Sequence, residues 1–154
     1  MIRINMLIYI ASDHRGFNLK EKLTPFLKES GHEVFDLGPA TYKADDDYPD
    51  FAELVAKKVG EAPEESAGIL ICGSGAGMCV AVNKFKNIRA AMAISPEQAR
   101  AARSDDHINV LCLASDYLSE EAVVKIVSDW LSTAYSQEER HLRRLKKIST
   151  FETD

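Results

Sequence analysis

A cysteine followed at once by a glycine-rich turn is the feature of this sequence that points most directly to chemistry. In the segment Gly68–Cys79, the apolar run Ile69–Ile71 ends on Cys72 and gives way to alternating glycine and small residues, beyond which a helical pattern begins. The backbone N–H groups of such a turn and of a helix N-terminus bind anions, and they favour the thiolate form of a nearby cysteine. The segment therefore predicts a reactive Cys72 beside a negatively charged substrate.

Two other interpretations of this segment have to be weighed. Most cysteines are small buried hydrophobic residues, and this is the structural alternative for Cys72. The glycines at positions Gly73, Gly75 and Gly77 have the spacing GxGxG after the third predicted strand, whereas a dinucleotide fingerprint has GxGxxG after the first. A module that binds NAD(H) is therefore disfavoured. An anion hole for a developing enolate oxygen fits the turn better.

The other residues of types that bind metal ions do not have the spacing expected of a metal site. Cys79 and Cys112 lie inside a predicted helix and a predicted strand, where packing is the expected role. The three cysteines of the chain form no CxxC pair, which fits a reducing cytosol better than a disulfide framework. The run Asp45–Asp47 precedes a helix start, where acidic residues are favoured without any metal. We expect no metal site and no cofactor.

Apolar strand-like runs alternate with helical patterns from end to end, after a short extension at Met1–Asn5. The expected strands are Met6–Ala11, Glu33–Leu37, Ala67–Cys72, Arg89–Ala93 and Val110–Leu113. The expected helices are Phe17–Ser30, one beginning near Pro49, about Gly77–Phe85, one opening at Pro96, about Ser119–Thr133 and a charged C-terminal helix over about Gln137–Phe151. This alternation predicts a doubly wound α/β fold: a five-stranded parallel sheet in a Rossmann-like three-layer sandwich with a C-terminal helix, forming one domain over residues 1–154.

Composition narrows the class of protein. The 154 residues are 45% apolar and 28% charged, as in an ordinary globular domain. The net charge of −5 argues against a nucleic-acid-binding surface. No apolar run approaches the roughly 20 residues of a membrane span, and no signal-peptide pattern precedes the first strand. We expect a cytoplasmic protein with no nucleic-acid or membrane partner.

Ligands of parallel sheets bind outside the carboxyl ends of the strands. This rule selects three loops: Ser12–Gly16 after the first strand, the glycine turn after the third, and Ser115–Asp116 after the fifth. The segment Asp105–His107 lies just before the fifth strand, at the opposite edge of the sheet. A dimer, rather than a single chain, would bring it to the same site.

Asp13 and His14 directly follow the first predicted strand. Such a pair is as readily a loop-capping arrangement as a binding site, but its place at the carboxyl edge favours binding. We expect His14 to meet a phosphate and Asp13 to accept a hydrogen bond from a sugar hydroxyl.

Four basic residues of the C-terminal segment, Arg140, Arg143, Arg144 and Lys147, share one helical face. A solvated helix flank is the ordinary explanation of such a face. Beside a phosphosugar site, Arg140 and Arg144 become candidates for a bidentate phosphate clamp.

Taken together and in order, these motifs resemble the type B ribose-5-phosphate isomerase and galactose-6-phosphate isomerase family. The motifs are Asp13-His14-x-Gly16-Phe17, Asp47-Tyr48-Pro49, Ile71-Cys72-Gly73-Ser74-Gly75-x-Gly77, Asn83-Lys84-Phe85, Arg89-Ala90, Asn109-Val110-Leu111 and Arg140-His141-x-x-Arg144. The resemblance covers nearly the whole chain. It is specific for the fold and the superfamily rather than for one sugar.

The resemblance implies cofactor-free isomerisation of an aldose phosphate to a ketose phosphate through a cis-enediolate. Cys72 matches the base that moves a proton between C1 and C2, and a base whose pKa lies near the working pH suits this task. Ser74 matches a residue that helps to open the sugar ring. The amides of the turn, at Gly73, Gly75, Ala76 and Gly77, match the anion hole.

The resemblance also implies the substrate contacts and the assembly. Asp13 and Tyr48 match residues that contact the sugar, and His14, Arg140 and Arg144 match phosphate contacts. Family members are dimers or tetramers of dimers whose sites are built from two subunits. The segment before the fifth strand is expected to supply two catalytic residues, Asp105 and His107, and two substrate-binding residues, Asp106 and Asn109.

Two positions depart from the family pattern. Typical ribose-5-phosphate enzymes carry a ring-opening histidine followed by asparagine where this chain has Asp105 and Asp106, and His107 lies two residues beyond the aligned position. Either His107 takes the role, or Asp105 transfers the proton, or ring opening is not needed. An arginine that follows the fifth strand in the family aligns with Asp116, and this reversal of charge weakens attraction for a phosphate.

The sequence accordingly favours an isomerase of ribose 5-phosphate. One alternative is an isomerase of another phosphosugar, of the allose or galactose 6-phosphate type. Another is a sugar-phosphate-binding relative without activity, which the loss of the usual histidine supports and the retained Cys72 and Ser74 oppose.

Overall fold

The computed structural model describes residues 5–153, so the predicted N-terminal extension lies, apart from Asn5, outside the described residues. The strands are β1 (Leu7–Ser12), β2 (Glu33–Asp36), β3 (Ser66–Cys72), β4 (Ala90–Met92) and β5 (Val110–Ala114). The helices are α1 (Phe17–Glu29), α2 (Tyr48–Glu61), α3 (Ala76–Val82), α4 (Pro96–Asp106), α5 (Glu120–Ser132) and α6 (Glu139–Ser149). The predicted alternation of strands and helices is confirmed.

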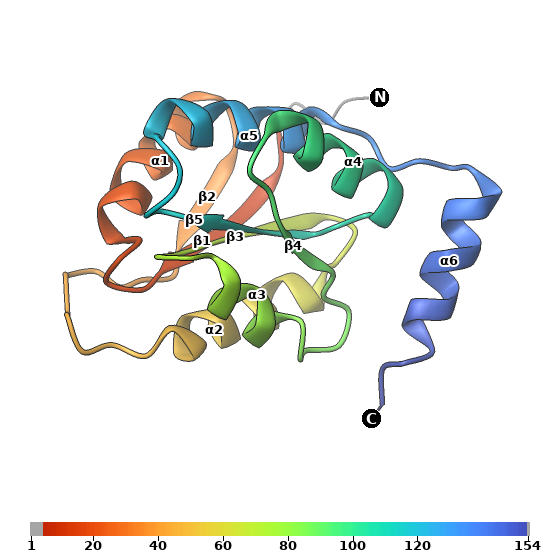
Figure 1. Cartoon of the computed structure of the whole chain (residues 1–154), viewed down its shortest axis with the longest axis horizontal. Coiled ribbons are helices and arrows are strands. Elements are labelled where there is room, and N and C mark those ends of the chain that lie inside the picture. Colours follow the sequence, from red (N-terminus) through yellow and green to blue (C-terminus); the bar gives the residue numbers. More distant parts are fainter. Residues whose placement is uncertain (1–4, 154) are drawn as a thin grey trace.

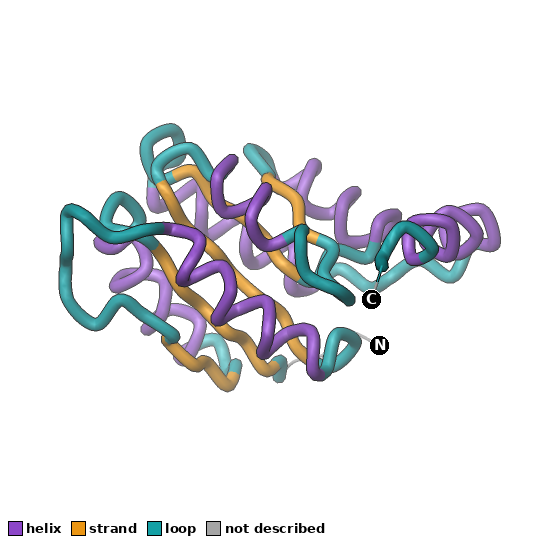
Figure 2. Tube along the Cα trace, turned by 90° about the horizontal axis from the view of Figure 1, so that it is seen from below, coloured by secondary structure: helices purple, strands orange, loops and turns teal. Residues whose placement is uncertain are grey.

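The five strands form one parallel sheet in the order β2-β1-β3-β5-β4. Helices α1, α4 and α5 cover one face and α2 and α3 cover the other, as Figure 1 shows. Seen from below, α2 runs along the strands while α6 stands clear of them at one side (Figure 2). The predicted doubly wound sandwich with a C-terminal helix is therefore confirmed.

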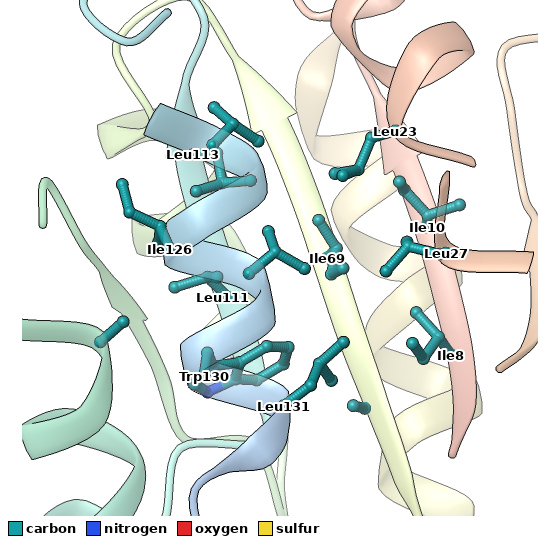
Figure 3. Packing of buried hydrophobic residues seen from close by; sticks show 14 of the residues in the cluster. Ile8, Ile10, Leu23, Leu27, Ile69, Leu111, Leu113, Ile126, Trp130 and Leu131 are labelled. Atoms are coloured by element: carbon teal, nitrogen blue, oxygen red, sulfur yellow. The ribbon is translucent and has the colours of Figure 1, made fainter. Parts of the chain in front are cut away.

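One core layer lies between the sheet and helices α1 and α5. Ile10, Ile69 and Leu111 point from three strands into this layer, where they meet Leu27 and Trp130 (Figure 3). All five side chains are inaccessible to solvent. Because the burial of each aliphatic side chain contributes about 1.5–3 kcal/mol, this layer fixes the registry of β1, β3 and β5.

The second core layer lies on the opposite face, against α2 and α3. Side chains alternate along a strand, so β3 turns Leu70 and Cys72 toward this layer, where they pack with Val55 and Met78. Cys72 is 4% exposed. The candidate base Cys72 thus lies at the margin of a packed layer, with its position set by β3.

The largest error in the predicted boundaries concerns α3, which ends at Val82 rather than at Phe85. Asn83 caps this helix, and its amide side chain bonds to the backbone N–H and C=O of Ala90 at 2.9 Å each. The side chain thereby ties the turn to β4 and stops the helix. The periodic apolar residues beyond Val82 had suggested a longer helix.

The chain leaves neighbouring strands in opposite directions at the centre of the sheet. After β1 it passes to α1 on one face, and after β3 it passes to α3 on the other (Figure 1). The two loops therefore diverge above the paired ends of β1 and β3, which is where parallel sheets of this type bind ligands. Among the described residues, no helix has the length and apolar character needed to cross a membrane.

Candidate active site

The glycine turn brings backbone donors to the Cys72 thiol. Gly75 adopts a left-handed conformation with φ of 75° just before α3, and its N–H donates to Cys72 Sγ at 3.1 Å. Such a φ strongly favours glycine. Ser74 is exposed beside the thiol, and its Oγ accepts a hydrogen bond from the Ala76 N–H at 3.3 Å. The turn therefore directs a backbone N–H donor to the thiol.

The loop after β1 lies directly against the end of β3. Asp13 donates its backbone N–H to the Ile71 carbonyl at 3.1 Å, and its carboxylate accepts the Gly16 N–H at 3.0 Å. A Cβ on Gly16 would lie 2.5 Å from the Ile71 oxygen, so only glycine permits this approach. Asp13 and Cys72 are thus held on adjacent strand ends, as the sequence predicted.

His14 is joined to a residue that the sequence analysis had not selected. Asp46 Oδ1 accepts from the His14 backbone N–H at 3.1 Å and lies 2.8 Å from the ring Nδ1. The groups of Asp13, His14 and Asp46 that could ligate a metal lie within 4.8 Å of one another. Because the imidazole is already bonded directly to the carboxylate, the arrangement is better described as a carboxylate–imidazole pair.

Tyr48 reaches the same turn from the start of α2. A Cβ added to Gly77 would lie 2.8 Å from Tyr48 Cζ, so the phenol ring rests on the glycine backbone. The Tyr48 side chain remains 39% exposed. It is therefore free to contact a ligand over the turn.

The loop after β5 completes this edge. Ser115 Oγ donates to the carbonyl oxygens of Arg15 and Cys72, at 3.0 and 3.1 Å. Arg15 forms an ion pair with Asp116, and its guanidinium covers Gly73, whose added Cβ would lie 2.4 Å from Arg15 Nε. Arg15 was not among the predicted site residues. Asp116, which stands where the family has an arginine, thus holds a cation from the loop after β1.

The predicted residues before β5 lie at the amino edge of the sheet, away from the Cys72 turn. His107 follows α4 in a left-handed conformation, stacks on the Tyr135 ring at 4.3 Å and bonds through Nε2 to the Ser136 carbonyl at 2.9 Å. Burial, reinforced by the nearby Arg89 and Arg103 charges, lowers the pKa of His107. The ring is therefore held by contacts within its own chain.

Asn109 and the two aspartates differ from each other in their surroundings. Asn109 is fully buried, accepts the Arg89 N–H at 2.9 Å and donates to the Asn87 carbonyl at 2.8 Å. Asp105 and Asp106 are exposed at the end of α4, and Asp105 lies 3.8 Å from the His141 ring. Asn109 thus links β5 to the turn before β4, whereas the aspartates remain accessible.

Arg140 and Arg144 lie on α6, which projects from the rest of the fold (Figure 1). Both are exposed, and Arg140 Nε bonds to Glu138 at 2.7 Å. A cleft of about 720 Å³ separates the end of α6 from residues 83–91, and it includes Asp106 but none of the residues around Cys72. The structure therefore does not bring the two arginines to the Cys72 turn of their own chain.

The other two thiols, Cys79 and Cys112, contact each other. Contact with Cys112 lowers the pKa of Cys79 to about 7, and the same contact together with burial raises the pKa of Cys112. Cys112 is inaccessible to solvent and Cys79 is partly exposed. Both pack in the layer against α3, in agreement with the prediction.

Comparison with known proteins gives the family. The family model described as Ribose/Galactose Isomerase matches residues 8–148. The chain belongs to this family. It is 46% identical over 147 residues to the probable ribose-5-phosphate isomerase B of Mycoplasma genitalium, covering 96% of each sequence. This ribose/galactose isomerase relationship confirms the resemblance inferred from the ordered motifs.

Solved structures of the family share the fold closely. The M. genitalium enzyme, determined with bound ribulose 5-phosphate, superposes with a TM-score of 0.92 at 45% identity over 95% of both chains. The Clostridium thermocellum ribose-5-phosphate isomerase B superposes with a TM-score of 0.89 at 39% identity over 95% of this chain and 97% of that one. The chain is thus an isomerase by family, with its thiol and turn at the ligand-binding edge of the sheet.

Proposed function

We propose that this protein interconverts ribose 5-phosphate and ribulose 5-phosphate without a cofactor. The observation that carries the proposal is the Cys72 thiol at the carboxyl end of β3, bonded to the Gly75 N–H and next to the paired end of β1. The family relationship and the ribulose 5-phosphate held by the M. genitalium relative support the choice of sugar.

The chemistry requires one base and an anion hole. In the open-chain aldose, the Cys72 thiolate removes the proton from C2, and the electron pair forms a C1–C2 double bond as charge moves to the C1 oxygen. The N–H groups of the turn stabilise this cis-enediolate. The hydroxyl proton on the C2 oxygen passes to the C1 oxygen, and return of the carbon-bound proton from the Cys72 thiol to C1 leaves a hydroxyl at C1 and a carbonyl at C2, which is the ketose. Ser74, which is exposed two residues after Cys72, is assigned to ring opening.

Substrate binding follows from the groups around the turn. Asp13 and Tyr48 are assigned to sugar hydroxyls, and His14 is assigned to the phosphate. Arg140 and Arg144 are too far along the projecting α6 to serve the Cys72 of their own chain, so we assign them to the phosphate in a second copy. The proposed enzyme is a homodimer, or a tetramer of dimers, with shared sites. Its three free cysteines support a cytoplasmic location.

Proton NMR in deuterated water tests the reaction and the sugar together. Ribose 5-phosphate, allose 6-phosphate and galactose 6-phosphate are each incubated with the wild type, with Cys72→Ala and with the matched thiol control Cys79→Ser. We expect ribulose 5-phosphate to form with deuterium on carbon, and this signal to disappear only in Cys72→Ala. Turnover of another sugar alone would reassign the substrate, and turnover by Cys72→Ala at the wild-type rate would refute the mechanism.

A mixing experiment tests the shared site. Cys72→Ala and the double variant Arg140→Ala/Arg144→Ala are each expected to be nearly inactive. When subunits are exchanged between them, a mixed dimer contains one site with both an intact thiol and intact arginines. Recovery of activity supports sharing, whereas no recovery, with exchange verified by native mass spectrometry, would place the arginines and the thiol in one chain.

A further inference from the structure

The loop between β2 and α2 returns to the end of β1 and places Asp46 against His14. Ser12 donates its N–H to the Gly38 carbonyl at 3.0 Å, which fixes the beginning of this loop, and the Asp46 N–H bonds to the Lys43 carbonyl at 3.3 Å near its end. Asp46 is 32 residues from His14 in sequence. Their contact is therefore a product of the tertiary fold.

Asp46 binds His14 at two points. A single oxygen, Oδ1, accepts from the backbone N–H at 3.1 Å and lies 2.8 Å from Nδ1. With Nδ1 engaged in this way, the proton on that nitrogen points at the carboxylate, and Nε2 is the ring nitrogen left for other partners. The His14 side chain is 27% exposed.

The burial of the Asp46 carboxylate carries a free-energy cost. Its side chain is only 6% exposed, and Oδ2 is buried without a hydrogen-bond partner in the described part of the chain. Burying an unpaired carboxylate oxygen is unfavourable. Its neighbours Asp45 and Asp47 are exposed, as expected of acidic residues before a helix. Asp46 therefore differs from Asp45 and Asp47 in being buried and bonded to another segment of the chain.

We propose that Asp46 is a positioning residue for substrate phosphate: it fixes the His14 ring with the proton on Nδ1 and Nε2 turned to the ligand. When the ring carries a proton on both nitrogens, Nδ1–H stays bonded to Asp46 and Nε2–H donates a hydrogen bond to a phosphate oxygen. Asp46 acts through His14 and does not touch the reacting carbons. The assignment rests on the proposed function in taking a sugar phosphate as the ligand.

The first test reads the ring directly and needs no activity. Nitrogen-15 NMR of histidine-labelled protein at alkaline pH identifies which nitrogen of neutral His14 bears the proton. We expect Nδ1–H in the wild type and in Asp46→Asn, whose carbonyl oxygen can still accept both hydrogen bonds. Asp46→Ala is expected to shift toward the Nε2–H form, and Asp45→Ala is the matched control. A wild-type ring with the proton on Nε2, or an Asp46→Ala spectrum like the wild type, overturns the proposal.

The second test measures recognition of phosphate. Inorganic phosphate is titrated calorimetrically into each variant, with thermal unfolding used to confirm that it is folded. We expect Asp46→Ala to weaken phosphate binding roughly tenfold, the loss typical of one charge-assisted hydrogen bond, with Asp46→Asn intermediate and Asp45→Ala unchanged. Unchanged phosphate affinity in folded Asp46→Ala refutes the role.

Kinetics separate positioning from participation in the chemistry. We expect Asp46→Ala to raise the KM for ribose 5-phosphate by the same factor while kcat stays close to that of the wild type. A fall in kcat with KM unchanged would mean that the pair acts in proton transfer, and would overturn the assignment. If the wild type turned over no sugar, the proposed function would fail, while the NMR and phosphate titrations would still decide the role of Asp46.

Discussion

The two edges of the sheet contain similar polar residues but use them differently. At the carboxyl edge, the Cys72 thiol accepts a backbone N–H, Ser74 is exposed, and His14 is bonded to Asp46 through Nδ1, which leaves Nε2 for another partner. At the amino edge, the His107 ring and the Asn109 amide are bonded to backbone groups of their own chain. One edge thus presents its polar groups to a ligand, and the other uses them to join segments of the fold.

Residues that belong to the motifs of one family can therefore have different roles at the two edges of the sheet. Cys72, Ser74, His14 and Asn109 all lie in motifs that resemble one isomerase family, yet Asn109 is bonded within the fold while Ser74 is exposed. At the amino edge, the accessible groups are the carboxylates of Asp105 and Asp106. Substitutions at the carboxyl edge are therefore expected to change activity more than stability. Substitutions at the amino edge are expected to change stability more than activity, except at Asp105 and Asp106.

The largest expected effect is on catalysis by Cys72→Ser. The hydroxyl is isosteric and can still accept the Gly75 N–H, but it is a much weaker base than a thiolate. We expect kcat to fall by about 10²–10⁴, the range for losing a general base, with a nearly unchanged urea midpoint. Steady-state kinetics and urea unfolding measure both. A urea midpoint that falls markedly in Cys72→Ser would contradict the proposed difference between the two edges.

Arg103→Ala should have the reverse signature. Arg103 is buried between the rings of Trp130 and Tyr135, and it donates to the Ile108 carbonyl at 2.6 Å. We expect a loss of about 3 kcal/mol in unfolding free energy, with kcat maintained at temperatures where the variant is folded. Arg100→Ala, on the exposed side of the same helix, is the control and should cost less than about 1 kcal/mol.

Asp105 and His107, two residues of one segment, are the two candidates for the ring-opening role. The His107 ring is already stacked and bonded, whereas Asp105 is exposed, so we assign any ring-opening role to Asp105 of a second copy. Asp105→Asn is expected to lower kcat roughly tenfold, and His107→Gln to leave it nearly unchanged. Measuring kcat with ribose 5-phosphate decides between them. The opposite ranking would return the role to His107.

A pH effect on stability follows from His107. Because burial lowers the pKa of this ring in the folded state, the unfolded chain binds a proton first as the pH falls. The stability is fully present above the ordinary histidine pKa of about 6.5 and declines below it. Urea midpoints at about pH 7.5 and 5.5 should differ less in His107→Gln. Burial also lowers the pKa of His32, so part of the dependence should remain.

The smallest effect is expected for the ion pair between Arg15 and Asp116. Their side chains are 56% and 35% exposed, and solvent screens such pairs. A double-mutant cycle with Arg15→Ala and Asp116→Ala should give a coupling of about 0–1 kcal/mol in unfolding free energy. A coupling above that range would show that the pair is a structural element of the carboxyl edge.

The sequence was sufficient for the parts of the structure that depend on local patterns. Apolar runs and turn residues predicted the parallel sheet, and the break after Cys72 predicted the turn that surrounds the thiol. The position of Asp105–His107 before β5 correctly predicted that it would lie at the other edge. These inferences succeed because strand direction in an alternating α/β chain determines which loops meet.

The contacts of individual side chains could not be predicted in the same way. Asp46 was interpreted as a helix-start residue because nothing in the acidic run marks it as the one that a loop returns to His14. Arg15 lies next to a recognised motif, but its place over Gly73 depends on Asp116, about a hundred residues further along the chain. The end of α3 depended on a bond from Asn83 to β4. The first two contacts join segments that are distant in sequence, and the third joins a helix end to the following strand, seven residues away.

The projection of α6 has a consequence for how activity would scale with the amount of protein. Leu142, Ile148 and Phe151 are exposed on or just after this helix, at 41%, 42% and 76%. If its arginines complete the site of a second copy, catalysis requires an encounter, and the specific activity must fall when the enzyme is diluted below the dissociation constant of the pair. A dilution series at saturating sugar would then follow a mass-action curve, and expression level would set the activity per molecule as well as the number of molecules.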